Sequence, residues 1–135
     1  MFTTTRRVEF ADTDMAGIMH FSNFFRFMEV AETAFLRERG LSVTWPDGDT
    51  RYGFPRVSAS CDYTRPVRFG DELTIGVTVE KVGTKSVSYR YDFSLAGQPV
   101  ATGRMTAVYC RAVHPHGIDP LPIPPDLRAK LEADA

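Results

Sequence analysis

A single long apolar helical segment is the feature of the sequence that most constrains the fold. From about Ser22 to Arg39, large apolar side chains recur at the spacing of one helical face. This face consists of Phe24, Met28, Ala31 and Phe35, and it is widened by Phe21, Phe27 and Ala34. Gly40 is placed to end the helix, since glycine readily takes the left-handed conformation that follows a helical C-terminus. Because the segment is unusually aromatic, we expect the helix to be buried on more than one side.

The segments after this helix alternate between apolar and polar side chains, which is the pattern of strands with one covered face. The clearest example is the run from Ser86 to Leu95, in which every second residue is apolar. The other predicted strands are a short one at Thr4–Phe10 and longer ones at Phe54–Arg65, Leu73–Glu80 and Pro99–Ala112. Hairpin turns are predicted at Val82–Lys85 and Ala96–Gln98.

The remaining segments carry weaker signals. Ser42–Gly53 is rich in turn-forming residues and is predicted as a loop, and His114–Pro125 is a proline-rich tail. Asp126–Ala133 is predicted as a short final helix.

One long apolar helix and several antiparallel strands pack most economically when the sheet curls around the helix. We therefore predict an α+β fold in which an antiparallel sheet wraps one long central helix. With 135 residues, of which 43% are hydrophobic, the chain can fill one core, so residues 1–135 are predicted to form a single domain. Such a sheet leaves strand edges uncovered, which favours dimerisation through a continuous sheet.

The charge and the cysteine content argue against several classes of protein. The 16 basic and 17 acidic residues are spread along the chain and give a formal charge of -1, which makes a nucleic-acid partner unexpected.

Cys61 and Cys110 lie far apart without a second cysteine at metal-ligand spacing, so we expect reduced thiols packed in strands. Met1–Arg7 is not followed by an apolar stretch, and no apolar run reaches membrane-spanning length. We therefore expect a soluble cytoplasmic protein that does not enter a membrane.

The least ordinary part of the sequence is the segment Val8–Ile18, which contains Asp12 and Asp14. This segment, together with Asn23 and the aromatic residues of the helix, resembles the N-terminal signature of the 4-hydroxybenzoyl-CoA thioesterases. In overall pattern the resemblance extends over about residues 4–112, although only the first forty or so carry a specific motif. It implies the hotdog fold, in which a sheet wraps one helix, and a homo-oligomer that is commonly a homotetramer.

The position of Asp14 just before the predicted helix suits thioester hydrolysis. The reaction needs a group that attacks the carbonyl or activates a water, and donors that stabilise the oxyanion. The chain turns at Gly17 and enters the helix, whose first backbone N–H groups have no partner within the helix. The resemblance implies that Asp14 is the catalytic carboxylate and that the backbone N–H of Phe21 is the oxyanion donor. The residues alone leave open whether Asp14 acts as a nucleophile or as a general base towards water.

Two further residues of this segment need separate interpretation. Asp12 is interpreted as a structural residue or as one that supports the catalytic group from behind, because like charges two residues apart would otherwise oppose each other. His20 has two open interpretations: it protonates the departing thiolate or binds a phenolic group of the substrate, or it is a surface or pocket-wall residue. Relatives of the short-chain branch tend to carry the histidine one position later, where this chain has Phe21, so the resemblance does not carry a catalytic role over to His20.

The resemblance also points to residues that bind the rest of an acyl-CoA. The turn expected to approach the nucleotide consists of Gly83, Thr84, Lys85 and Ser86. Lys85 would be a phosphate contact, although a solvent-exposed lysine at a hairpin is the commoner case. Asn23 is expected to fix the catalytic loop through its amide, and Ser58 or Ser60 to line the acyl pocket from a facing strand.

The sequence therefore predicts an acyl-CoA thioesterase that releases a free acid and CoA. Aromatic acyl groups are slightly favoured because the helix offers several phenylalanines, and short or medium aliphatic groups stay open. No cofactor is expected, since CoA is part of the substrate, and His114 and His116 lack the further ligands of a metal site. Two alternatives are a hotdog dehydratase, which would ordinarily need a central histidine with an acidic partner, and a non-catalytic acyl-CoA-binding protein.

Overall fold

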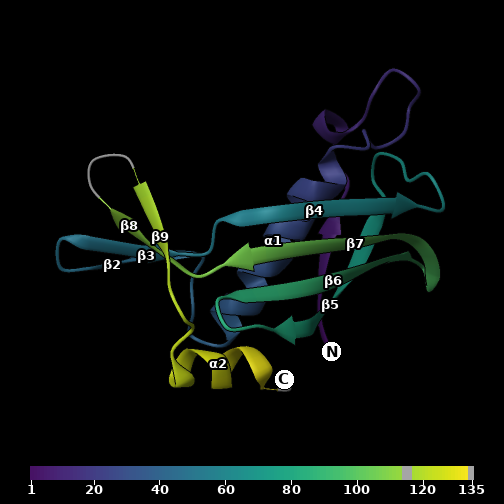
Figure 1. The fold of residues 1–135 in the computed structure, drawn as a ribbon. Coiled ribbons are helices and arrows are strands. Elements are labelled where there is room, and N and C mark those ends of the chain that lie inside the picture. Colours follow the sequence, from purple (N-terminus) through teal and green to yellow (C-terminus); the bar gives the residue numbers. More distant parts are fainter. Residues whose placement is uncertain (114–116, 134–135) are drawn as a thin grey trace.

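An antiparallel five-stranded sheet and one long helix form the main body of the protein. The computed structural model describes residues 1–113 and 117–133. The sheet has the strand order β1-β5-β6-β7-β4, and helix α1 lies across one of its faces (Figure 1). The elements are β1 (Phe2–Arg7), α1 (Asn23–Glu38), β4 (Arg56–Tyr63), β5 (Glu72–Val82), β6 (Ser86–Leu95) and β7 (Gln98–Val108). The predicted α+β class, with an antiparallel sheet around one long helix, is confirmed.

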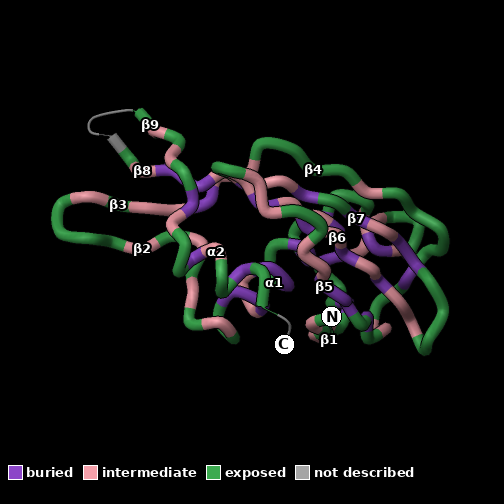
Figure 2. The backbone as a smooth tube through the Cα atoms, turned by 60° about the horizontal axis from the view of Figure 1, so that its bottom comes forward, coloured by how far each residue is buried: buried purple, intermediate pink, exposed green. Residues whose placement is uncertain are grey.

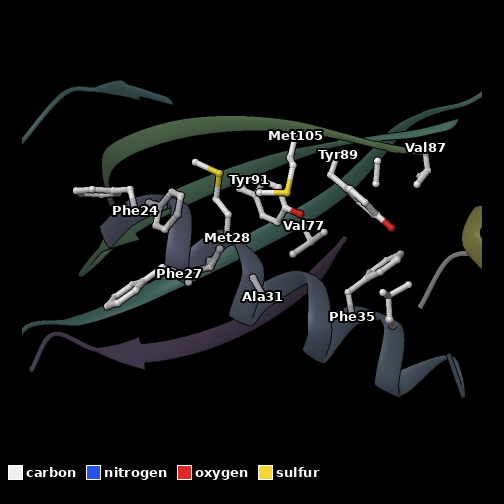
Figure 3. Packing of buried hydrophobic residues seen from close by; sticks show 14 of the residues in the cluster. Phe24, Phe27, Met28, Ala31, Phe35, Val77, Val87, Tyr89, Tyr91 and Met105 are labelled. Atoms are coloured by element: carbon white, nitrogen blue, oxygen red, sulfur yellow. The ribbon is translucent and has the colours of Figure 1, made fainter. Parts of the chain in front are cut away.

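Helix α1 begins and ends close to its predicted bounds. Gly40 has a φ of 71°, and the N–H of Leu41 donates to the carbonyl oxygen of Leu36 at 2.8 Å, so the glycine ends the helix as expected. The apolar face of α1 packs against the buried side chains that alternate along β6. In Figure 3, Met28 points toward Tyr91, and Phe35 points toward Tyr89. The helix and the sheet thus share one core.

A second, smaller sheet extends away from α1 (Figure 1). It has the order β2-β3-β8-β9, with β2 (Thr44–Asp47), β3 (Thr50–Gly53), β8 (Cys110–Val113) and β9 (Gly117–Pro120). The prediction of a loop at Ser42–Gly53 is therefore wrong, and the predicted strand Pro99–Ala112 is divided between β7 and β8. The rings of Trp45 and Tyr52, and those of Tyr52 and Tyr109, stack with centroids 6.1 Å and 5.9 Å apart. This stack joins residues distant in sequence, so local composition could not reveal the hairpin.

The predicted first and last elements are shifted along the chain. β1 ends at Arg7 instead of Phe10, because the chain turns after Val8 and forms the short 3₁₀ helix η1 (Phe10–Asp12). The last helix, α2 (Pro125–Glu132), is close to its prediction and buries Leu127 and Leu131. No helix within the described residues has the length and apolarity needed to cross a bilayer.

β4 forms one edge of the main sheet and pairs only with β7 there. Most of its residues are exposed (Figure 2), and Val57 keeps 64% of its surface accessible. At its start, Arg56 forms an ion pair with Glu32, a fully buried carboxylate of α1. The strand is therefore fastened to the helix at one end, and its outer edge lacks a neighbouring strand among the described elements.

Candidate active site

The loop between η1 and α1 folds back on itself as a tight turn. Thr13 pairs with Met19, and the N–H of Asp14 donates to the carbonyl oxygen of Ile18 at 2.9 Å. Gly17 closes the turn by donating its N–H to the Asp14 carbonyl oxygen at 3.0 Å. Gly17 has a φ of 80°, a left-handed conformation that favours glycine. The predicted role of Gly17 as the turning point before the helix therefore has a geometric cause.

Three hydrogen bonds hold this loop in place. The Asp12 carbonyl oxygen accepts the backbone N–H of His20 at 2.9 Å and the side-chain amide N–H of Asn23 at 2.8 Å. The N–H of Met19 donates to the carbonyl oxygen of Val67 at 2.7 Å, and this bond connects the loop to the segment after β4. Asn23 is buried and has the contact expected of a residue that fixes the loop. The Asp12 carboxylate accepts the N–H of Glu9 at 2.8 Å, so it has the structural role that the sequence suggested.

Asp14 is one of the residues that line a cavity of about 460 Å³. One of the Asp14 carboxylate oxygens, Oδ1, accepts the N–H of Ala16 at 2.9 Å, and the side chain is half-buried. The other lining residues are mostly apolar: Ile18, Met19, Phe21, Phe24, Tyr63, Thr64, Arg65, Pro66 and Val67. A carboxylate in such a setting is accessible to a ligand and is held in a defined orientation by the turn.

The start of α1 borders the same cavity through Phe21. The carbonyl oxygen of Phe21 accepts the N–H of Phe24 at 3.3 Å, and that of Ser22 accepts the N–H of Phe25 at 3.2 Å. These two bonds lead the chain into α1, which begins at Asn23. Within residues 1–113 and 117–133, the N–H of Phe21 donates no hydrogen bond. Asp14 and Phe21, whose N–H is unpaired among the described residues and lies just before α1, thus line one cavity, and the hydrolysis of a thioester requires a carboxylate and an oxyanion donor of this kind.

His20 lies beside this cavity and does not line it. Its Nδ1 atom is 2.7 Å from the Ser22 hydroxyl oxygen and accepts the N–H of Ser22 at 3.3 Å. Its ring stacks on the ring of Phe21, with centroids 4.6 Å apart. Of the two interpretations of His20, this arrangement favours the one without a catalytic role.

The structure does not bring Ser58 or Ser60 to the Asp14 cavity. These serines are opposite Thr106 and Arg104 in β7, whereas the intervening Ala59 is opposite the buried Met105. Cross-strand partners share a face of the sheet, so both serines project from the face that is turned away from α1. Tyr63 lies an even number of residues from Ala59 and therefore projects from the same face of β4, toward the helix. The sequence did not point to Tyr63, because only the strand register shows which residues face the helix.

The turn of Gly83, Thr84, Lys85 and Ser86 also lies away from the cavity within one chain. It joins β5 to β6 beside α2 (Figure 1), where the Thr84 carbonyl oxygen accepts the N–H of Ile123 at 2.9 Å. Phe35, near the C-terminal end of α1, contacts Tyr89, while Phe24 at the other end contacts Phe93. The 16 residues of α1 span roughly 24 Å. One chain alone therefore keeps the predicted nucleotide contact about a helix length from Asp14.

The described residues contain no group of three or more His, Cys, Asp and Glu side chains suited to a metal ion. His114 and His116 lie outside the described residues. Cys61 and Cys110 are free thiols in β4 and β8, as predicted. Burial raises the pKa of the Cys61 thiol to about 11, which makes it a poor nucleophile near neutral pH.

Residues 8–131 match the thioesterase-like superfamily. A 1,4-dihydroxy-2-naphthoyl-CoA hydrolase of Synechocystis is 30% identical over 124 residues, which are 91% of this chain and 90% of that protein. The structure of a gentisyl-coenzyme A thioesterase matches with a TM-score of 0.81 at 29% identity, covering 96% of this chain and 99% of the other. A 4-hydroxybenzoyl-CoA thioesterase matches in fold, with a TM-score of 0.82 at 21% identity over 97% of this chain and 98% of the other. These similarities confirm the family resemblance and the hotdog fold.

Proposed function

The chain belongs to the thioesterase-like superfamily, and we propose that it hydrolyses the thioester of an aromatic acyl-CoA to the free acid and CoA. The main observation in support of this function is the cavity lined by both Asp14 and Phe21, whose amide lies just before the helix. The carboxylate can act on the thioester carbonyl carbon while the amide N–H stabilises the negative charge on its oxygen.

Both roles of Asp14 give a balanced reaction. As a nucleophile, a carboxylate oxygen bonds to the carbonyl carbon, CoA leaves as a thiolate, and water then hydrolyses the mixed anhydride. As a general base, the carboxylate takes a proton from a water whose oxygen bonds to the carbonyl carbon, and the thiolate leaves from the tetrahedral intermediate. Since a thiol has a pKa of about 8.5, the thiolate leaves readily near neutral pH, and neither route needs His20 as an acid.

The acyl group that we propose is a hydroxylated aromatic ring. The names of the two enzymatic relatives specify 1,4-dihydroxy-2-naphthoyl and gentisyl groups. In both groups one hydroxyl is on the carbon next to the one that bears the thioester carbonyl, and the second is para to the first. The rings of Phe21, Phe24 and Tyr63 line the Asp14 cavity and suit edge or face contacts with such a ring.

A panel of acyl-CoA substrates tests this function directly. Thiol release would be measured for 2,5-dihydroxybenzoyl-, 4-hydroxybenzoyl-, benzoyl-, butyryl- and hexanoyl-CoA. We expect kcat/KM to be highest for the dihydroxybenzoyl compound and lowest for the aliphatic ones. Tight binding without thiol release on every compound would instead identify a non-catalytic acyl-CoA-binding protein.

We further propose that the active form is a homo-oligomer, built from dimers and most simply a homotetramer. The support is the exposed edge of β4, which can pair with the β4 edge of a second copy. Antiparallel pairing sets the start of one β4 beside the end of the other, and this end carries Tyr63. A second copy also offers a nucleotide-binding turn other than the one that lies at the far end of α1 in the same chain.

The reaction that we propose needs no cofactor other than the CoA of the substrate, because the two groups on the cavity supply the carboxylate and the oxyanion donor. The compartment that we propose is the cytoplasm, where free thiols such as those of Cys61 and Cys110 are maintained.

A further inference from the structure

Tyr63, the last residue of β4, links the edge of the main sheet to the entry of helix α1. Its hydroxyl donates a hydrogen bond to the carbonyl oxygen of Phe21 at 3.0 Å. Its ring meets the ring of Phe24 edge to face, with centroids 5.1 Å apart. Tyr63 also lines the cavity of Asp14. A single side chain therefore contacts the helix entry, the helix and the cavity.

The helix entry is also restrained by the backbone, because the N–H of Asn23 donates to the His20 carbonyl oxygen at 2.9 Å and so holds the peptide group that carries the Phe21 N–H. Side-chain restraints are fewer. Ser22, the residue before α1, makes no side-chain capping bond within the described part of the chain, and its hydroxyl is hydrogen-bonded to His20. The Phe21 carbonyl oxygen also accepts the N–H of Phe24, but at the long distance of 3.3 Å. Among the described residues, the Tyr63 hydroxyl is the side-chain group that fixes Phe21 to the sheet.

We propose that Tyr63 is a positioning residue: by holding the carbonyl side of Phe21 it completes the orientation of the Phe21 N–H toward the substrate carbonyl, together with the backbone bond of Asn23 to His20. The inference rests on the proposed function, in which this N–H stabilises the oxyanion. A donor stabilises the developing charge only if it already points to the place where that charge appears, so a small rotation of the residue weakens the effect. The hydroxyl acts through Phe21 and does not itself transfer a proton.

Two observations speak against direct acid catalysis by Tyr63. Its hydroxyl proton is already donated to the Phe21 carbonyl oxygen. Burial raises the pKa of the phenol above its ordinary value, so the group gives up its proton less readily than a free tyrosine. The structural role of the hydroxyl is thus separable from the chemistry at Asp14.

The first test compares Tyr63→Phe with the native protein on the best substrate of the panel. The phenylalanine keeps the ring contact with Phe24 and removes only the hydroxyl. We expect kcat to fall by about tenfold with little change in KM, since misdirecting a donor loses part of the 10²–10³-fold effect of removing one. Tyr52→Phe, in β3 on the second sheet, is the matched control and is expected to leave both constants unchanged.

The second test reads the polarisation of the substrate carbonyl without turnover. In Asp14→Asn protein, the carbonyl stretch of bound, isotope-labelled 2,5-dihydroxybenzoyl-CoA is expected to lie at lower wavenumber than in solution. Adding Tyr63→Phe is expected to reverse part of this shift, which a mere loss of stability would not do. Unchanged kcat and an unchanged carbonyl stretch in the Tyr63 variants would overturn the inference.

The two tests also separate this inference from the function on which it rests. If the native protein releases no thiol from any acyl-CoA, the proposed function fails, while the carbonyl stretch of the bound compound still decides the role of Tyr63. If no acyl-CoA binds at all, both fail. If the native protein is active and Tyr63→Phe equals it in kcat and in carbonyl stretch, only the inference about Tyr63 fails.

Discussion

At the scale of single residues, the site depends on side chains that shape the loop around Asp14. Gly17 allows the left-handed turn, and Asn23 donates from the first residue of α1 to the Asp12 carbonyl oxygen. Asp14 is in turn held by the N–H of Ala16. None of these contacts takes part in the chemistry that we propose. Together they fix where the carboxylate and the Phe21 amide meet the cavity.

Removing the Asn23 side chain is expected to loosen the loop and to lower stability. Asn23→Ala deletes a buried hydrogen bond, so we expect the free energy of unfolding to fall by about 1–3 kcal/mol and kcat to decrease. Urea denaturation and thiol release would measure the two effects. Thr33→Ala is the control on the same helix, since the one hydrogen bond of the Thr33 hydroxyl among the described residues goes to the Glu29 carbonyl oxygen one turn earlier. An equally small effect of both substitutions would contradict the role of Asn23.

At the scale of elements, the buried pair of Glu32 and Arg56 joins α1 to the start of β4. Glu32 is fully buried, and one of its oxygens, Oε2, has no hydrogen-bond partner among the described residues. Burial raises the pKa of the Glu32 carboxyl above its ordinary value, although Arg56 opposes the shift. The junction between helix and edge strand is therefore sensitive to protonation of one carboxylate.

This shift predicts how stability depends on pH. A raised pKa in the folded state means that folding favours the protonated carboxyl, so the stability contributed by Glu32 is largest at low pH and is lost as the pH rises through the folded pKa. Glu32→Gln cannot titrate and serves as the reference. We expect the native protein to lose stability relative to Glu32→Gln as the pH is raised from about 4 to about 8. Urea denaturation across this range would measure the free energy of unfolding of both proteins. A native free energy of unfolding that stays constant or rises relative to that of Glu32→Gln would contradict the prediction.

The elements differ in how far the sequence could predict them. The bounds of α1 follow from its continuous apolar face and from Gly40, both of which are local features. The β2–β3 hairpin was missed because its support is the stack of Trp45, Tyr52 and Tyr109, which forms only when distant segments meet. The site divides in the same way: Asp14 and Gly17 belong to one local motif, whereas Tyr63 reaches Phe21 across 42 residues.

At the scale of the whole molecule, the uncovered edge of β4 predicts self-association. We expect light scattering to give the mass of a homo-oligomer, a tetramer or at least a dimer. Val57→Asp, which adds a charge to the exposed β4, is expected to shift the mass towards the monomer and to lower activity. Ile118→Asp is the control, because Ile118 is similarly exposed but lies on the second sheet. A fully active native monomer would exclude an active site that needs a second copy.

The catalytic role of Asp14 is tested most directly by the thiol release of Asp14→Asn on the best acyl-CoA substrate. Asparagine keeps an oxygen that can accept the N–H of Ala16, so the loop retains its shape while the carboxylate is lost. Asp49→Asn, which changes an exposed carboxylate between β2 and β3 that does not line the cavity, is the matched control. We expect kcat to fall by about 10²–10⁴-fold in Asp14→Asn and to be unchanged in Asp49→Asn. Equal rates of thiol release by the native protein and Asp14→Asn would contradict the catalytic role of Asp14.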